Sequence, residues 1–455
     1  MSRFPPRRSA RAKLSDDVLL VTGATAVTMD AHERALPLDV RVEAGRIAAV
    51  AEKLPTRGVT RVIDGRGMIL LPGLVQAHVH LSHTLLRGTA DGMDLMTWQR
   101  ERVFPAEGVL SPDDLRASVR LGIVELLLGG TTTALDFGTV RHTEVAFQEA
   151  ERLGLRYTGG KAVMDHGQGY PASLRETTAD AVVESARLCE RWHGAASGRL
   201  RYAFSPRSAL TATDKAIAAL AKVARERQAL IHIHAAENPE EVAMVRERTG
   251  RGNIEHLHAL GATGKDVVMA HGIWLSSDER RILRETGTRV VHCPSANLRL
   301  ASGIARVAEL LADGVEVALG ANSAAANDHL DIFAEMRLAA LIHKVRDGAT
   351  AVPAATALRM ATQGGAAALG LDDIGSIEVG KRADLVLMDL HRPHLFPEVG
   401  DLAARIVYAG RASDVHTVIV DGVVRVEAGA MVDVDVEAVM REAQAAAVRV
   451  AGRVS

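Results

Sequence analysis

Aromatic residues are scarce in this chain of 455 residues, since Phe, Trp and Tyr together make up 3% of it. Proteins that hold single-stranded nucleic acid stack its bases on aromatic rings, so the composition offers few residues for that role. Charge of either sign is also not in excess, because the formal net charge is −2. No long-range field therefore draws the chain to nucleic acid or to an anionic membrane, and we expect neither as a partner.

Cysteine is nearly absent, with only Cys189 and Cys293, and these lie far apart in the sequence. Without a disulfide framework or a C-x-x-C pair, the cytoplasm is the expected compartment. No run of about 18 apolar residues occurs, so the sequence predicts no membrane-spanning helix. Residues 1–16 are rich in arginine, but no apolar stretch of a signal peptide follows them, which favours a disordered basic tail.

The apolar content of 47% is enough for a large core, and its pattern changes along the chain. Between residues 71 and 374, strand-like runs alternate with amphipathic helical patterns, as βα units around a parallel sheet do. We count eight such units, which predict an α/β fold of the (β/α)8 TIM-barrel type. After a first strand ending at His78–His80, the predicted strands lie at 131–136, 156–165, 200–204, 229–234, 266–271, 289–292 and 315–322.

The two ends of the chain, residues 17–70 and 375–455, show the shorter period of β-strands instead. Asp421-Gly422 is a typical two-residue hairpin turn. We expect the two ends to pair into one composite β-sandwich, with a closing helix at 437–450. Within the barrel, Ser111 before Pro112 predicts the start of a helix, and Gly287 predicts the end of one.

Polar residues follow several of the predicted barrel strands, at the end where barrel enzymes carry their sites. His78 and His80 are two positions apart, so they share one face of a strand and can aim two imidazoles at one point. His234, His271 and Asn322 end three later strands. Each histidine alone could be a hydrogen-bonded core residue. Together they predict a metal site of nitrogen ligands, with zinc as the first choice.

Glu237 follows His234 by three residues and lies just beyond the strand end. Its carboxylate could reach a metal-bound water or a substrate ring nitrogen and move a proton between them. Alternatively, it could be a helix N-terminal Glu that complements the macrodipole. His232 shares the parity of His234 and is interpreted as core packing or as support for the ligands. His83 could line the pocket or lie in a surface loop.

Eight motifs carry a resemblance to the amidohydrolase superfamily, specifically its ATZ/TRZ branch of aminohydrolases and chlorohydrolases. That branch includes methylthioadenosine/S-adenosylhomocysteine, 5′-deoxyadenosine and guanine deaminases and the s-triazine hydrolases. The likeness covers nearly the whole chain, from residue 18 to 432. The motifs are PGLVQAHVH at 72–80, TLLRG at 84–88, GTTT at 130–133, HIHAAE at 232–237, AHG at 270–272, HCPSANL at 292–298, MRLAAL at 336–341 and GKRADL at 380–385.

The resemblance implies one divalent metal, zinc or alternatively iron, bound by His78, His80 and His234. It places His271 beside the attacking water and makes Glu237 the proton carrier. Two substrate contacts are also implied. Arg207 stands where guanine deaminases contact the base and methylthioadenosine deaminases have a histidine.

Glu107 matches the position where nucleoside deaminases hold the ribose hydroxyls, although a solvated loop Glu is an equal alternative there.

One position departs from the family, which has Thr-Asp-Gly after strand eight. This chain has Ala321-Asn322-Ser323, and Asn322 can ligate a metal only weakly and cannot act as a base. Either Glu237 and His271 do all the proton work, or the metal is weakly held, or the protein is no longer a hydrolase. The s-triazine branch tolerates a non-acidic residue here.

The leading hypothesis is a metal-dependent aminohydrolase that deaminates an N-heteroaromatic small molecule by metal-hydroxide attack. An adenosine-type nucleoside is favoured: 5′-deoxyadenosine, methylthioadenosine or S-adenosylhomocysteine. The alternatives are a guanine or s-triazine deaminase or chlorohydrolase, and a catalytically impaired binding homologue. A homo-oligomer is expected by analogy with the family.

Overall fold

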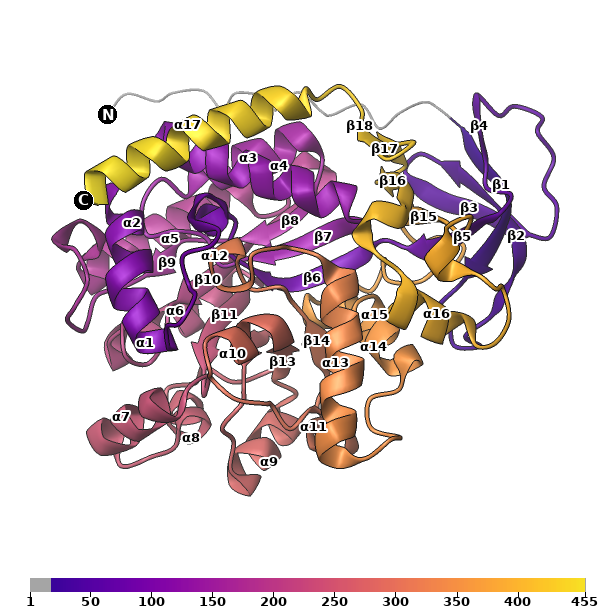
Figure 1. Cartoon of the computed structure of the whole chain (residues 1–455). Helices are drawn as coiled ribbons and strands as arrows, with labels where there is room; N and C mark the ends of the chain where they lie inside the picture. The colour runs from indigo at the N-terminus through magenta and orange to yellow at the C-terminus, as the bar shows by residue number, and fades with distance from the viewer. Residues whose placement is uncertain (1–17, 455) are drawn as a thin grey trace.

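A computed structural model describes residues 18–454, so the tail predicted at 1–16 lies outside the described residues. Eight parallel strands pair side by side in chain order and form the barrel at the centre of Figure 1. Asn322, just after the last strand, bridges to Val79 of the first and closes the circuit. The predicted (β/α)8 barrel is confirmed. Its strands are β6 (Leu74–Val79), β7 (Thr131–Asp136), β8 (Arg156–Gly159), β10 (Leu200–Pro206), β11 (Leu230–Ala235), β12 (Val267–His271), β13 (Arg289–His292) and β14 (Val317–Leu319).

The side-chain alternation of β11 shows how a barrel strand serves two environments. Ile231 and Ile233 are fully buried in the apolar layer between the barrel and its helices. His232 and His234 have the opposite parity and point to the barrel interior, where His232 meets His78 of β6 and His234 meets His80 directly after that strand. The strand thus places its two imidazoles inside the barrel while its aliphatic residues hold the outer helices.

The third predicted strand, at 156–165, is wrong in one respect, because the structure divides it into β8 and the short β9 (Ala162–Val163). Gly160 lies at the break, where a Cβ atom would stand 1.7 Å from the carbonyl oxygen of Ala203 in β10. The chain passes too close to its neighbour there for any side chain. Strand-forming residues lie on both sides of Gly159 and Gly160, so the sequence pattern predicted one continuous strand.

The predicted ends of two helices are confirmed. Ser111 caps α3 (Pro112–Leu128): its hydroxyl accepts from the backbone N–H of Asp114, and the Asp114 carboxylate accepts from the Ser111 N–H. Gly287, with a φ of 70°, ends α9 (Ser277–Thr286) in the left-handed conformation that favours glycine.

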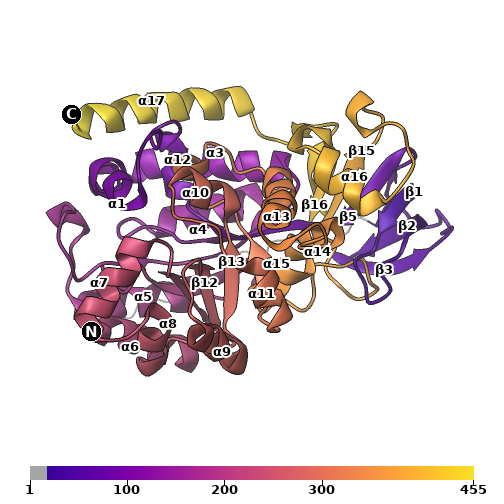
Figure 2. The same cartoon turned by 60° about the horizontal axis from the view of Figure 1, so that its bottom comes forward.

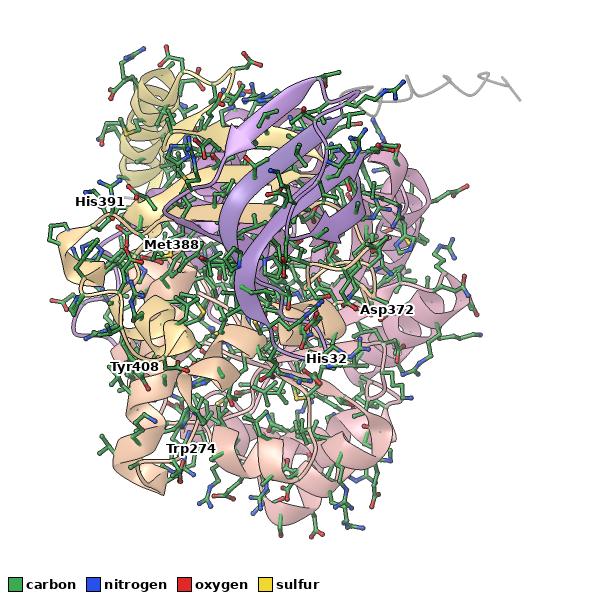
Figure 3. All side chains as sticks on the ribbon, turned by 90° about the vertical axis from the view of Figure 1, so that its right-hand side faces the viewer. His32, Trp274, Asp372, Met388, His391 and Tyr408 are labelled. Atoms are coloured by element: carbon green, nitrogen blue, oxygen red, sulfur yellow. The ribbon has the colours of Figure 1, made fainter. Side chains whose placement is uncertain are left out.

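Strands from both ends of the chain form one nine-stranded sheet, which confirms that the ends build a common β unit. Figure 3 looks onto this sheet, where the purple N-terminal strands lie beside the yellow C-terminal ones. The two sets join where β5 pairs antiparallel with β15. The sheet strands are β1 (Leu19–Val27), β2 (Ala35–Glu43), β3 (Arg46–Ala51), β4 (Arg61–Asp64), β5 (Met68–Pro72), β15 (Leu385–Asp389), β16 (Val415–Val420), β17 (Val423–Glu427) and β18 (Ala430–Met431).

The sheet curls on itself, so that apolar residues of its two ends share one core. The predicted hairpin turn at Asp421-Gly422, with φ of 50° and 75°, joins β16 to β17. A Cβ atom on Gly422 would lie 2.8 Å from the Cα of Gly45, in the turn between β2 and β3. Arg156 of the barrel strand β8 fastens this sheet to the barrel through buried ion pairs to Asp384 at 2.6 Å and Asp421 at 2.5 Å.

The closing helix α17 (Val436–Val454) leaves the sheet and lies across α3, along the barrel side of the molecule (Figures 1 and 2). Arg449 and Arg453 both form ion pairs with the buried Asp114 of α3. The domain boundaries at 71 and 375 stay a prediction. Of the helices within residues 18–454, none combines the length and apolar character needed to cross a bilayer.

Candidate metal centre and active site

Three histidines from two strands converge inside the barrel. His78 in β6, His80 directly after it and His234 in β11 each offer a ring nitrogen, and these nitrogens lie within 4.8 Å of one another. The Nε2 atoms of His80 and His234 are 3.1 Å apart. All three side chains are buried, with His78 completely so. The structure thus brings together the three histidines that sequence reasoning proposed as ligands.

Hydrogen bonds to the Nδ1 atoms of His78 and His234 fix the orientation of these two rings. Nδ1 of His78 lies 2.9 Å from Nε2 of His232, and Nδ1 of His234 lies 2.9 Å from the carbonyl oxygen of Arg207. Each of these two rings therefore presents Nε2 to the group. Burial lowers the pKa of His78, His80 and His234 well below the ordinary value, so the imidazoles are neutral, as metal ligands must be.

The donor set fits a divalent cation. His78 Nε2 is buried and has no hydrogen-bond partner among the described residues, although it faces two further imidazoles. An unpartnered buried nitrogen is costly unless something else binds it. Neutral imidazoles suit zinc in particular, and iron, nickel or copper after it.

Glu237 and His271 lie beside the three histidines. The carboxylate oxygen Oε1 of Glu237 is 3.5 Å from Nε2 of His271, and Nδ1 of His271 is 2.8 Å from the side-chain oxygen of Asn297. Burial raises the pKa of Glu237 to about 8 and lowers that of His271 to about 4. Both groups are therefore neutral near pH 7, a state in which Glu237 can donate a proton.

The structure places Glu237 just before a helix and not within its first turn. The following helix α7 (Pro239–Thr249) takes Asn238 as its N-cap, so Glu237 precedes the helix. Ala236, with a φ of 53°, turns the chain between β11 and this point. His271 is also left-handed, with a φ of 77°. Such backbone strain in non-glycine residues is concentrated at functional sites.

Asn322 lies where the barrel closes, beside the first two histidines. Its backbone N–H donates to the carbonyl of His78, and its own carbonyl accepts from the N–H of His80. Its φ of 59° is left-handed, and asparagine tolerates that conformation better than most residues. The backbone of Asn322 is therefore fixed directly to the strand that carries His78 and His80.

Glu107 and Arg207, both expected as substrate contacts, form an ion pair with each other. Arg207 Nη1 is 2.7 Å from Glu107 Oε2, and His83 Nε2 is 2.6 Å from the other oxygen, Oε1. Both carboxylate oxygens are thus in use. His83 stacks on His80, with ring centroids 4.7 Å apart, so it is not a surface-loop residue. Glu107 is buried as well, so it is not a solvated loop residue.

A cavity of about 610 Å³ leads from the surface to these residues. It is lined by Arg207, His234 and Glu237 and by apolar residues such as Phe104 and Met244. This volume suits a drug-sized or nucleoside-sized ligand.

Sequence reasoning missed one further acidic residue of this wall. Glu241 in α7 lines the cavity and accepts a hydrogen bond from the backbone N–H of Glu237, at 2.8 Å. Asn253 donates to its other oxygen at 2.9 Å. Burial raises the pKa of Glu241 to about 7. Its spacing of four from Glu237 was the available signal, but that spacing implies a shared helix face, and Glu237 is not on the helix.

Comparison with known proteins places the chain in a family. The profile of the Amidohydrolase family matches residues 69–425. A 5-methylthioadenosine/S-adenosylhomocysteine deaminase of Pelotomaculum thermopropionicum is 37% identical, over 96% of this chain and 99% of that protein. A 5′-deoxyadenosine deaminase of Methanothermobacter thermautotrophicus is also 37% identical, over 96% of this chain and 100% of its own length.

Solved structures agree with these relatives. An adenosine deaminase from Xanthomonas campestris with bound zinc superposes with a TM-score of 0.90, at 31% identity, over 96% of this chain and 99% of that one. The zinc complex of an atrazine chlorohydrolase from Arthrobacter aurescens gives a TM-score of 0.88, at 28% identity, over 94% and 100%. The resemblance seen in the sequence is confirmed, and the chain belongs to the amidohydrolase family.

Proposed function

We propose that this protein is a metal-dependent aminohydrolase that removes the exocyclic amine of an N-heteroaromatic small molecule. An adenosine-type nucleoside is the first candidate: 5′-deoxyadenosine, methylthioadenosine or S-adenosylhomocysteine. Relatives with 35–38% identity over most of the chain are named deaminases of these compounds. The single observation that carries the proposal is the convergence of three neutral imidazoles beside a cavity that His234 and Glu237 line.

His78, His80 and His234 would hold the metal, with Asn322 beside them. Zinc is the proposed metal, because the donors are imidazoles and both zinc-bound structural relatives share the fold. Iron is the alternative. A divalent cation at this place supplies the nucleophile by lowering the pKa of a water molecule toward neutrality.

Glu237 is the proposed proton carrier of the reaction. Because burial holds its carboxyl neutral near pH 7, it can protonate a ring nitrogen of the substrate. The carboxylate that remains can then take the proton of the hydroxyl added to the ring carbon and pass it to the departing amine. His271, held by Asn297, faces Glu237 and can stabilise the negative charge that develops on the attacked ring. Arg207, at the cavity wall, would contact the heteroaromatic ring.

An ammonia-release assay tests the proposal. The zinc-loaded protein is offered adenosine, 5′-deoxyadenosine, methylthioadenosine, S-adenosylhomocysteine, guanine and aminated triazines at pH 7. We expect release from at least one nucleoside, with kcat/KM above 10⁴ M⁻¹ s⁻¹ as an ordinary enzyme shows on its own substrate. No release from any compound, with zinc shown to be bound, would refute the proposal.

Two specific observations favour the second candidate, a guanine or s-triazine deaminase or chlorohydrolase. Asn322 is uncharged, whereas the family resemblance implies an aspartate at this position, and Arg207 stands where the resemblance implies a histidine in methylthioadenosine deaminases. The same panel decides, with chloride release from chlorinated triazines added. An impaired binding homologue is the third candidate, and it predicts zinc-free protein that still binds a heteroaromatic ligand.

Two further proposals concern the assembly and the compartment of the protein. We propose a homo-oligomer by analogy with the family and a cytoplasmic location from the two free, buried cysteines. Sedimentation velocity measures the first, and fractionation of cells that express the protein tests the second.

A further inference from the structure

Glu107 is placed to hold protein groups rather than substrate. One carboxylate oxygen accepts from Arg207 at 2.7 Å and the other from His83 at 2.6 Å. Its side chain is 3% exposed. Glu107 is not among the described residues that line the cavity, whereas its partner Arg207 is.

Arg207 is held from three further sides. Its guanidinium lies over the ring of Phe104 at 4.8 Å, and Nη1 contacts the sulfur of Met164 at 3.6 Å. Its backbone carbonyl accepts from Nδ1 of His234 and so orients a proposed metal ligand. The guanidinium therefore has one stable place, which is between Glu107 and the cavity.

The other partner of Glu107 leads to the histidine cluster as well. His83 stacks on His80 with an angle of 5° between the rings. A ring held this way restricts the rotation of His80, whose Nδ1 has no hydrogen-bond partner among the described residues. Glu107 thus fixes one group that faces the substrate and one that supports a metal ligand.

Each carboxylate oxygen can accept a second hydrogen bond, but Glu107 is buried and does not line the cavity, so a ribose diol could reach it only if Arg207 moved aside. That exchange would leave a buried guanidinium without its carboxylate, which is strongly unfavourable. The hydroxyl pair of a substrate offers neutral hydrogen bonds in return, and these are weaker than the charge-assisted bonds lost.

We propose that Glu107 is a positioning residue that fixes Arg207 and His83, and that it does not bind the ribose of a nucleoside. The inference rests on the proposed function. It predicts that Arg207 contacts the heteroaromatic ring of the substrate and determines specificity for that ring. It also predicts that the substrate class extends to nucleosides without a 2′,3′-diol.

The first test compares adenosine with 2′,3′-dideoxyadenosine on the zinc-loaded protein. We expect their kcat/KM values to agree within about threefold, because no buried group is left unpaired when the diol is absent. A site built to bind a substrate hydroxyl rejects the analogue that lacks it by on the order of 10⁴-fold. A loss of 100-fold or more for the dideoxy compound, removed by Glu107→Gln, would overturn the inference.

The second test is a double-mutant cycle in kcat/KM with Glu107→Gln and Arg207→Met. If Glu107 acts through Arg207 as well as His83, the loss in the double variant is smaller than the product of the two single losses, because the part that depends on Arg207 is lost only once. Additive losses would overturn the inference, and they are what a general structural role predicts. Glu101→Gln, a half-exposed carboxylate six residues earlier, is the matched control and should leave kcat/KM within twofold.

The cycle also separates this inference from the proposed function. If the wild-type protein releases ammonia from neither nucleoside, the proposed substrate class fails. The wild type, the two single variants and the double variant are then compared by thermal unfolding without metal. Coupling between residues 107 and 207 then supports the positioning role, since the ion pair exists without substrate. Additive changes in Tm would overturn it.

Discussion

His232 should control how tightly the protein holds its metal, although it is not among the three proposed ligands. Its Nε2 lies 2.9 Å from Nδ1 of His78, and both rings are completely buried. Burial lowers the pKa of His232 to about 3, so the ring is neutral and can accept a hydrogen bond. If Nε2 of His78 binds the metal, its Nδ1 carries the proton and donates it to His232.

His232→Phe removes this acceptor while keeping a ring of similar size. In the metal-free variant, His78 can carry its proton on Nε2, which faces the neutral rings of His80 and His234. Metal binding forces the proton back to Nδ1, where it has no acceptor, and that costs about 1–3 kcal/mol. Since about 1.4 kcal/mol is tenfold in affinity, the Kd for zinc should rise roughly 10- to 100-fold.

Zinc affinity is measured by competition with a chromophoric chelator at pH 7. The matched control is His343→Phe, a buried histidine that pairs with His292 at 3.2 Å and has no contact with the three ligands. The control should keep the wild-type Kd within twofold. A Kd of His232→Phe equal to that of the control, with both proteins folded by circular dichroism, would refute the assignment of His78 Nε2 as a ligand.

Four further outcomes are expected. Glu237→Gln should lower kcat by about 10²- to 10⁴-fold with zinc content unchanged, as loss of a proton carrier does. Arg156→Met should destabilise the protein by about 3–5 kcal/mol in urea unfolding, because it leaves two buried carboxylates unpaired. Burial alone would raise the pKa of Glu107, but its contacts with Arg207 and His83 outweigh this and lower the pKa from 4.5 to about 2. The ionised carboxylate therefore stabilises the fold fully above pH 4.5, and this stability is lost as the pH falls toward 2. Glu107→Gln should make Tm depend less on pH in that range. Asn322→Asp should tighten zinc binding in the competition assay, because it adds a carboxylate.

The barrel could be predicted because its signal is local. The period of the strands, the helix caps at Ser111 and Gly287 and the two-residue spacing of His78 and His80 each lie within a few residues of sequence. Strand parity then decides which side chains face inward, and the barrel topology brings strand ends together without further information. Proximity of His234 to the first two histidines followed from these rules alone.

The second layer of the site could not be predicted, because its contacts have no sequence period. Glu107 and Arg207 are 100 positions apart, and Glu107 lies in a region of short helices after β6 where no periodicity sets the direction of a side chain. Two residues that look like separate substrate contacts in the sequence turn out to neutralise each other. His83 was ambiguous for the same reason, since only packing against His80 shows that it is buried.

Position 322 has two separable tasks, and this makes the asparagine informative. Its backbone closes the barrel by hydrogen bonds to His78 and His80 in a left-handed conformation, which asparagine and aspartate both tolerate. Exchanging one for the other therefore leaves the backbone unstrained and changes only the charge beside the three histidines. Because those imidazoles are neutral and burial keeps Glu237 neutral near pH 7, Glu237 adds no ionised carboxylate beside Asn322. The uncharged site is a property of the local environment as well as of the asparagine.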